Sequence, residues 1–600
     1  MPYVLRLEDV SLDRIAEVGG KSASLGEMIR SVKEAGVHVP GGFAITADAY
    51  RRHLAVNDLE EWVYAALDAL DPTDVAALSR VGGELRERIA QAPLPEDVAA
   101  EVAAAYSALS RECGEDETDV AVRSSATAED LPEASFAGQQ ESFLNVQGLV
   151  ELDRAIRACM ASLFTDRAIS YRAKLKIPHR EVALSVCVQK MIRSDLSCSG
   201  VMFTLDTESG FRDVVLINAS WGLGEYVVKG RGNPGGFWVH KPTLEAGYRS
   251  ILRKELGAKE VRLIYGSGNG AKCLEESVPE QERGRFVLSD DEVLELARMG
   301  VSIEKHYSAR AGRPMPMDIE WAKDGRTGAL TILQARPETV HAGGSRAALE
   351  LFELEGNPKP VLRGKSVGNR IGVGRVSVVS STADLAAFKD GDVLVTRMTD
   401  PDWEPILARA AAVVTEQGGR TCHAAIVSRE HGIPCVVGTE NATTVMKAGA
   451  EVTVSCAEGD EGRVYEGAVP FAREEIDPAE LPTPPVPLML NLANPDLAFH
   501  LASLPCAGVG LMRIEFLLSN WIGIHPMALL RPDRLESREE RDAVVARTRA
   551  YDSPATYFVE RLASGIAQVA AAFYPRPVIV RFSDFKTNEY AGLLGGEPFE

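Results

Sequence analysis

One stretch decides how the middle of the chain folds: Gln417-Gly418-Gly419-Arg420-Thr421-Cys422-His423-Ala424-Ala425-Ile426-Val427-Ser428. The apolar run 412–415 before it predicts a strand, the paired glycines predict a turn, and a helix is expected to begin at about Thr421. His423 then lies in the first helical turn. Free backbone N–H groups and the positive end of the helix dipole favour a phosphoryl dianion there and disfavour imidazolium. A neutral imidazole is the nucleophilic form, so His423 is our candidate nucleophile.

The alternative for His423 is a hydrogen-bonded structural histidine at a helix start. The double glycine weakens this alternative, because glycine lets a substrate approach the backbone closely. Metal ligation is disfavoured, since no second His or carboxylate stands at ligand spacing and His431 falls outside the i, i+3 or i+4 pattern.

Around this stretch the chain of 600 residues is too long for one hydrophobic core. Two segments, 340–364 and the proline-rich 477–487, have the composition of linkers. We therefore expect an α/β multidomain protein. Its expected parts are listed in chain order: a nucleotide-binding region at 1–345, a domain carrying His423 at 346–476, a linker at 477–487, and a β/α region at 488–600.

Composition excludes several classes of function. The formal charge of −21 disfavours a nucleic-acid partner, because its phosphates would be repelled. No run of eighteen apolar residues is present, so no membrane span is expected. The nine cysteines form no C-x-x-C pair, and the start of the chain lacks a basic, apolar signal, which together favour a cytoplasmic protein.

A predicted hairpin in the N-terminal part gathers groups suited to a magnesium triphosphate. Two strands, 317–321 and 330–337, flank the turn sequence 323–325. Alternation puts Asp318 and Glu320 on one face, and Gln334 and Arg336 on one face of the second strand. Hard oxygens would serve the metal and guanidinium the phosphates. The competing interpretation is a solvated surface hairpin.

Lys21 and Arg123 are further local cations of the kind that an acidic protein needs in order to bind ATP. Gly19-Gly20-Lys21-Ser22 is not a P-loop, because Ile15 stands where that motif requires glycine.

The C-terminal part begins a β/α series, with strands expected at 488–492, 509–516 and 578–582. Arg513 and Arg581 each follow such a strand, at the end where barrel enzymes place their sites. Taken alone, either arginine would more often be a surface residue.

Together, these motifs resemble the phosphoenolpyruvate (PEP) synthase, or pyruvate, water dikinase, family of PEP-utilizing enzymes. The stretches that carry the resemblance run in order through the chain: 19–28, 123–130, 136–142, 318–322, 334–338, 418–426, 508–516 and 583–590. The resemblance implies an ATP-grasp region, a swivelling phosphohistidine domain and the first part of a (β/α)8 barrel. It implies conversion of ATP, pyruvate and water to PEP, AMP and phosphate, a gluconeogenic reaction.

The resemblance also implies residue roles. His423 would accept the β-phosphoryl group, Arg513 and Arg581 would bind pyruvate, and Thr421 would be the target of a regulatory kinase or phosphorylase. ATP would be held by Lys21, Arg123, Gln189, Glu320, Gln334 and Arg336, with Glu320 and Gln334 on Mg²⁺. Relatives are commonly homodimers, which makes a dimer an open expectation.

Two departures from the family pattern bear on these expectations. Residues 307–316 are expected to form a longer connection than usual before the strand of Glu320. Residues 488–600 are also fewer than the roughly 250 of a β/α barrel. We therefore expect a chain cut off within the barrel, competent for the ATP half-reaction only.

Three alternatives remain open at this point. One is pyruvate, phosphate dikinase. Another is an antibiotic or other hydroxyl phosphotransferase built from the same ATP-grasp and histidine modules. The third is a non-catalytic remnant or phosphorelay scaffold.

Overall fold

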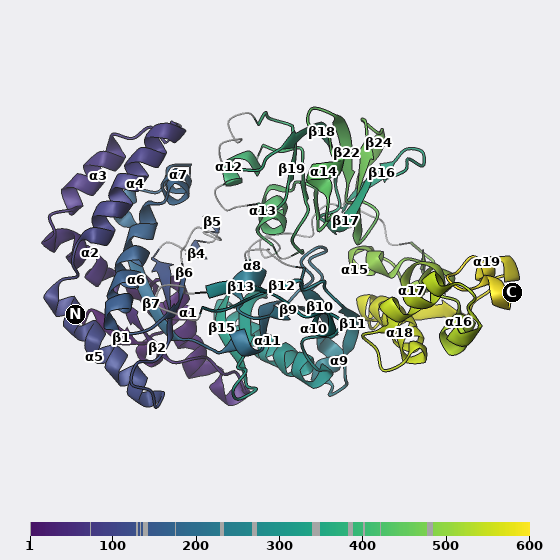
Figure 1. Ribbon diagram of the computed structural model, residues 1–600, viewed down its shortest axis with the longest axis horizontal. Coiled ribbons are helices and arrows are strands. Elements are labelled where there is room, and N and C mark those ends of the chain that lie inside the picture. The colour runs from purple at the N-terminus through teal and green to yellow at the C-terminus, as the bar shows by residue number, and fades with distance from the viewer. Residues whose placement is uncertain are drawn as a thin grey trace.

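The computed structural model divides the chain into an N-terminal region (2–338), a central domain (349–476) and a C-terminal region (484–600) (Figure 1). No helix among the described residues is both long and apolar enough to cross a lipid bilayer. The described residues are 2–72, 74–127, 130–131, 134–135, 142–174, 176–228, 233–266, 273–338, 349–381, 388–399, 403–407, 409–420, 422–476 and 484–600.

The first half of the N-terminal region is a sheet with helices packed on it, in the order β1-β2-β7-β3-β6. The buried, β-branched strands β3 and β7 form its middle and pair antiparallel along their whole length. The elements are β1 (Val4–Arg6), α1 (Ile15–Ser31), β2 (Gly42–Ile45), α2 (Ala47–Val56), α3 (Glu60–Asp68), α4 (Val75–Gln91), α5 (Glu96–Glu112), β3 (Val120–Ala126), β4 (Asp130–Leu131), β5 (Ala134–Ser135), β6 (Ser142–Val146), α6 (Leu149–Ala161), α7 (Asp166–Lys174) and β7 (Leu184–Lys190).

The second half of this region is another sheet, in the order β11-β10-β9-β8-β14-β15, with α11 packed against it. The helix α11 begins with a capping box at Ser289 and Glu292 and ends at the left-handed Gly312. The elements are β8 (Cys198–Phe203), β9 (Val214–Trp221), α8 (Glu225–Val228), β10 (Gly235–His240), α9 (Lys241–Glu245), β11 (Ile251–Glu255), β12 (Val261–Tyr265), β13 (Cys273–Ser277), α10 (Glu280–Arg283), α11 (Asp290–Ala311), β14 (Met317–Lys323) and β15 (Leu330–Pro337).

The central domain is a closed barrel in the order β17-β21-β20-β19-β18-β22-β23. A separate antiparallel ribbon, β16 with β24, pairs the beginning of the domain with its end, Leu349 opposite Ile476. The elements are β16 (Leu349–Leu354), β17 (Leu362–Val367), β18 (Ile371–Val378), β19 (Val393–Thr396), α12 (Glu404–Leu407), β20 (Ala412–Thr415), α13 (His423–His431), β21 (Cys435–Val437), α14 (Ala442–Val445), β22 (Glu451–Ser455), β23 (Glu461–Glu466) and β24 (Phe471–Ile476).

The C-terminal region contains a parallel sheet in the order β25-β26-β27, which is the start of a β/α arrangement. The long helix α18 packs against β11 of the N-terminal region as well as against its own sheet. The elements are β25 (Leu490–Leu492), α15 (Ala498–Leu501), β26 (Val509–Arg513), α16 (Pro526–Leu530), α17 (Arg538–Thr548), α18 (Pro554–Phe573), β27 (Val578–Arg581) and α19 (Thr587–Ala591).

The buried apolar clusters show which regions are fused and which are separate. One cluster joins the second N-terminal sheet to the C-terminal region; its members include Phe203, Leu216, Trp238, Leu252, Phe499, Met512, Leu517 and Trp521. The two clusters of the central domain lie entirely between Leu362 and Val464. Among the described residues, no buried apolar cluster joins the central domain to either neighbour.

The α/β multidomain architecture predicted from the sequence is confirmed, whereas the domain boundaries stay a prediction. Residues 477–483 and 340–348 of the expected linkers lie outside the described residues. The expectation that residues 307–316 form a longer connection than is usual in the family stays a prediction, although not all of these residues lie in a loop. The first half of this segment continues α11 as far as Ala311, because Tyr307 is buried and the helix ends only at Gly312.

Candidate active site

His423 is the first residue of α13, as the sequence predicts. The chain leaves β20, turns through Gly418 (φ 112°, a conformation that only glycine adopts readily) and enters the helix at the extended N-cap Cys422. The Cys422 side chain makes no capping hydrogen bond. His423 is half-buried. A half-exposed imidazole next to uncapped backbone N–H groups suits a phosphoryl acceptor.

Thr399 orients this imidazole, since its Oγ1 lies 3.2 Å from His423 Nδ1. A proton on Nδ1 donated to that hydroxyl leaves the lone pair of Nε2 for nucleophilic attack. Thr399 is not among the site residues predicted from the sequence, although a signal existed. Thr399 follows β19, and β19 pairs parallel with β20, so the carboxyl ends of both strands meet at one edge of the barrel.

The neighbouring thiol does not compete with the imidazole. Cys422 is buried, and burial raises the pKa of its thiol, so it stays protonated. Thr421, the expected regulatory residue, lies outside the described residues.

Lys21 lies against the first N-terminal sheet, in a helix bent at Gly19. Gly19 adopts φ 70°, and a Cβ there would lie 2.3 Å from the Ser125 carbonyl oxygen, so only glycine fits. Beyond this bend, Lys21 Nζ lies 3.4 Å from the Ser124 carbonyl oxygen on β3. The glycine pair thus brings Lys21 against the strand that carries Arg123.

Arg123 links the two N-terminal sheets, because its Nη1 lies 3.3 Å from Glu320 Oε2 on β14. The hairpin expected from the sequence is present: Glu320 lies opposite Gln334, and Asp318 lies opposite Arg336. Arg336 donates from Nε and Nη2 to Asp318 Oδ2 at 2.9 and 2.8 Å. Side chains of the two strands therefore pair across the hairpin.

The Asp318 side chain is only 14% exposed to solvent. Burial raises the pKa of its carboxyl, and this exceeds the opposite influence of Arg336. Strand alternation predicts that Asp318 shares a face with Glu320, but it does not indicate the pairing with Arg336. Arg336 is thereby positioned by a carboxylate that is itself largely withdrawn from solvent.

Gln189 lies on β7 on the same face as Arg123, because Cys187 pairs with Arg123 and Gln189 is two residues further along. Gln189 is 1% exposed. Its Nε2 and the Nε of Arg123 are buried donors with no hydrogen-bond partner among the described residues. Buried donors are rarely left unpaired, so these two indicate a place where a ligand supplies acceptors.

Glu320 and Gln334 offer a carboxylate and an amide oxygen side by side, the hard donors that Mg²⁺ prefers. Among the described residues, no group of three or more His, Cys, Asp or Glu side chains is arranged to hold a metal ion. This pair therefore fits a magnesium ion that completes its shell with water and substrate phosphates, as Mg²⁺ usually does.

Arg513 and Arg581 lie next to each other at the carboxyl ends of β26 and β27, as paired positions of parallel strands. Arg513 is exposed, and Arg581 forms an ion pair with Glu515. Burial by itself would raise the pKa of Glu515, but the Asp584 N–H and Arg581 outweigh it and lower that pKa. Arg581 Nε and Glu515 Oε2 remain buried without partners in the part of the chain that the structure describes.

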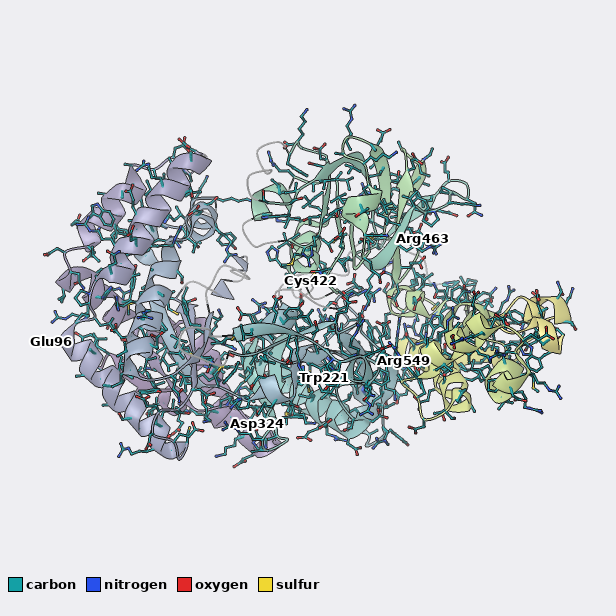
Figure 2. The ribbon with its side chains drawn as sticks, in the orientation of Figure 1. Glu96, Trp221, Asp324, Cys422, Arg463 and Arg549 are labelled. Carbon is teal, nitrogen blue, oxygen red and sulfur yellow. The ribbon has the colours of Figure 1, made fainter. Side chains whose placement is uncertain are left out.

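The central domain lies over the N-terminal region with its histidine motif toward that region. A Cβ on Gly419 would lie 3.3 Å from Pro234 Cδ, just before β10. Figure 2 shows Cys422, the neighbour of His423, on the side of the central domain that faces the N-terminal region. We call the candidate ATP-binding residues the Lys21 cluster: Lys21, Arg123, Gln189, Glu320, Gln334 and Arg336. His423, the Lys21 cluster and the arginine pair thus belong to three different regions of the molecule.

Three family models match consecutive parts of the chain. Residues 15–353 match "Pyruvate phosphate dikinase, AMP/ATP-binding domain", residues 388–459 match "PEP-utilising enzyme, mobile domain", and residues 479–594 match "PEP-utilising enzyme, PEP-binding domain". The chain is also 52% identical over 597 residues to phosphoenolpyruvate synthase of Deinococcus radiodurans, covering 99% of this chain and 74% of that protein.

This chain belongs to the phosphoenolpyruvate synthase family. Further members confirm the relationship: those of Pseudomonas aeruginosa and Escherichia coli are 50% and 49% identical over 602 and 601 residues. Each alignment covers 100% of this chain, and 75% and 74% of the respective relative. The resemblance seen in the motifs therefore extends over the whole chain, and the protein is an enzyme of the PEP-utilising type.

Proposed function

We propose that this chain acts as a phosphoenolpyruvate synthase, which converts ATP, pyruvate and water to PEP, AMP and phosphate through a phosphohistidine at His423. The observation that carries the proposal is the position of His423. Its half-exposed imidazole begins a helix on a domain that has its own core and faces the region of Lys21 and Arg123.

ATP is bound in this proposal by Lys21, Arg123, Gln189, Glu320, Gln334 and Arg336. Support comes from the convergence of their elements and from the unpaired buried donors of Gln189 and Arg123. Glu320 and Gln334 hold Mg²⁺, which when bound neutralises charge on the triphosphate.

In the first half-reaction, His423 accepts the β-phosphoryl group, water takes the γ-phosphate as inorganic phosphate, and AMP leaves. Thr399 orients the ring through its contact with Nδ1. The helix N-terminus offers backbone N–H groups to the anionic product.

In the second half-reaction, the phosphoryl group passes to pyruvate bound by Arg513 and Arg581. Guanidinium groups match carboxylate geometry, and the unpaired Nε of Arg581 supports a ligand at this edge of the sheet. Because the two arginines and the Lys21 cluster lie in different regions, the central domain has to move between them.

We propose further that residues 1–600 assayed by themselves carry the ATP half-reaction and make little PEP. A cytoplasmic location, a homodimer and control through phosphorylation of Thr421 are also part of the proposal. The nine thiols, none of them in a disulfide, agree with a reducing compartment.

Incubation with magnesium and ATP labelled in the β-phosphate tests the proposal. We expect acid-labile label on wild-type protein and none on His423→Ala, together with release of one phosphate per AMP. Release of pyrophosphate after phosphate is supplied would instead indicate a pyruvate, phosphate dikinase. Acid-stable label, or label that persists in His423→Ala, would refute the phosphohistidine.

A further inference from the structure

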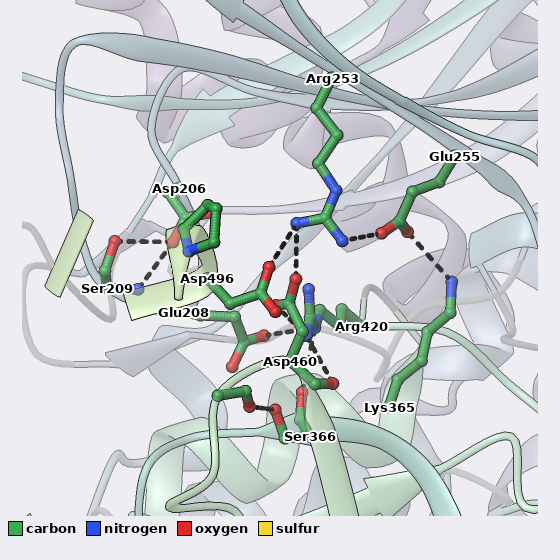
Figure 3. A network of polar contacts seen from close by, with 12 residues as sticks. Asp206, Glu208, Ser209, Arg253, Glu255, Lys365, Ser366, Arg420, Asp460 and Asp496 are labelled. Atoms are coloured by element: carbon green, nitrogen blue, oxygen red, sulfur yellow. Dashed lines mark hydrogen bonds and ion pairs between the residues drawn. The ribbon is translucent and has the colours of Figure 1, made fainter. Parts of the chain in front are cut away.

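A single side chain, Arg253 on β11, connects all three regions of the protein (Figure 3). Its Nη1 lies 2.6 Å from Asp460 Oδ2 in the central domain and 3.2 Å from Asp496 Oδ1 in the C-terminal region. Its Nη2 forms an ion pair with Glu255 on its own strand. We call these four residues the Arg253 junction. Arg253 is only 8% exposed, so the junction is buried between the regions.

A second polar contact holds the central domain from another side. Glu208, in the loop between β8 and β9, forms an ion pair with Arg429 of α13, the helix that His423 begins. Its other carboxylate oxygen accepts a hydrogen bond of 2.7 Å from the backbone N–H of Gly368. Arg420 Nε lies 4.0 Å from the same carboxylate. The helix and turn that carry the nucleophile are therefore both attached to the N-terminal region through Glu208.

The charges at these contacts are complementary between the regions. The central domain presents mainly cations, and its two neighbours present mainly carboxylates; Lys365 of the central domain, for example, lies 3.6 Å from Glu255. The cations are Arg253, Lys365, Arg420 and Arg429, and the carboxylates are Glu208, Glu255, Asp460 and Asp496. Such complementarity draws the central domain to this position and fixes its orientation.

These contacts are the kind that a moving domain can release. The N- and C-terminal regions share an apolar core, whereas the described apolar clusters of the central domain are all its own. Separation of the central domain therefore exposes little buried apolar surface, which would otherwise be the main cost. The contacts that are lost when the central domain separates are largely ion pairs.

At the Arg253 junction, separation leaves no charged side chain without a partner. Asp460 keeps a partner within the central domain, since Arg420 donates to its backbone carbonyl and pairs with its carboxylate. Arg253 keeps Glu255 and Asp496, and its guanidinium stays over the ring of Trp238 at 5.0 Å. An uncompensated buried charge would be strongly unfavourable, and this arrangement avoids one on either side.

We propose that Arg253 and Glu208 are positioning residues for the first half-reaction: they hold the central domain reversibly in the place where His423 faces the N-terminal region. This inference rests on the proposed function for its catalytic readout. Neither residue touches the reacting atoms. Their effect is on how often the imidazole is presented to ATP, and not on how tightly ATP binds.

The variants Arg253→Met and Glu208→Gln test this in the full chain. Loss of one partner of a buried charge pair weakens an interface strongly, so we expect single-turnover phosphorylation of His423 to slow by about tenfold or more in each variant. ATP affinity, measured by calorimetry, should stay within about twofold of wild type because neither residue belongs to the Lys21 cluster. Arg253→Lys keeps the cation and should recover part of the rate.

Domain position is measured independently of catalysis. Fluorescent amino acids placed at the exposed Val150 and Val445 report the distance between the N-terminal region and the central domain. We expect a broader distance distribution in Arg253→Met and Glu208→Gln. The matched control is Arg363→Met, which removes an ion pair with Glu461 inside the central domain and should change neither readout.

The outcomes separate this inference from the proposed function. Folded variants with unchanged phosphorylation rate and unchanged distances would overturn the role of Arg253 and Glu208. Should Arg253→Met not fold, Glu208→Gln decides alone by the same criteria. Absence of phosphohistidine in wild type would refute the proposed function, while the distance measurement would still support or overturn the positioning role.

Discussion

Thr399 Oγ1 lies 3.2 Å from Nδ1 of His423, across the edge where the parallel strands β19 and β20 end. The hydroxyl engages Nδ1 and thereby bears on how the imidazole ring is oriented. Because a hydrogen bond of this kind contributes about 0.5–1.5 kcal/mol, Thr399→Val should slow phosphohistidine formation by about two- to tenfold.

Thr399→Ser is the matched control for this prediction, since it keeps the hydroxyl. Rapid-quench measurement of acid-labile label compares the two variants. Equal rates in Thr399→Val and wild type would show that the ring needs no such orientation.

Gln189→Leu should separate ATP binding from stability. In the described structure the buried Nε2 of Gln189 has no partner, so its replacement by an apolar group of similar size should leave the free energy of unfolding unchanged or slightly higher. ATP affinity should fall about tenfold, because the donor would no longer meet the nucleotide.

Thermal unfolding with and without magnesium ATP measures both effects. Gln568→Leu is the control: Gln568 donates to the Pro495 carbonyl at 3.0 Å, so this change should destabilise the protein without affecting ATP. Unaltered ATP affinity in Gln189→Leu would remove Gln189 from the site.

Arg581→Lys should weaken binding of PEP by about tenfold or more, because lysine cannot reproduce the fork of the guanidinium. Labelling of His423 by ATP should be unaffected, since the arginine lies in another region. Calorimetry with PEP makes the comparison.

Arg576→Lys serves as the control for Arg581. Arg576 donates to the carbonyl oxygens of Ala502, Leu504 and Cys506, so its replacement should lower stability and leave PEP binding intact. An equal loss of PEP binding in both variants would argue for a general disturbance of the sheet.

Stability should fall below about pH 6.5 through His179. Burial, and then Arg172, lower the pKa of His179 to about 4. Its Nδ1 accepts a 3.0 Å hydrogen bond from Arg172 Nε, which requires a neutral ring. The unfolded chain binds the proton more readily, so this contribution is present above pH 6.5 and is lost as the pH falls toward 4.

The contribution of His179 should be of the order of 1 kcal/mol after solvent screening. Denaturant unfolding between pH 4 and 7 measures it. In His179→Gln the pH dependence over this range should become flatter; an unchanged slope would assign the effect to other groups.

The sequence predicted local elements well where a strong pattern met turn residues. The strand before His423 is β20, residues 412–415 as expected, and the predicted hairpin of 317–321 and 330–337 is present as β14 and β15. These features depend on side-chain alternation and glycine, which a sequence displays directly.

Contacts between residues far apart in the chain could not be predicted from local sequence patterns. Thr399 reaches His423 through a parallel strand pair, and Asp318 is largely withdrawn from solvent by packing that its own strand does not reveal. Arg253 and Asp460 are separated by some two hundred residues, and neither lies in a recognisable motif. Residues 307–311 extended α11 because burial of Tyr307 outweighed the loop-like composition that follows.

The ribbon of β16 and β24 brings the two covalent connections of the central domain to one place, since the chain enters at Leu349 opposite the place where it leaves at Ile476. Linkers that meet at one place limit how far the central domain can move more than they limit its orientation. Their main effect is therefore to keep His423 at a high local concentration near both substrates. A separately produced fragment of residues 349–476 should accordingly accept phosphate in trans from the remainder of the chain, at a rate that rises with the amount added. A sufficiently high concentration of the fragment would then replace the covalent connection.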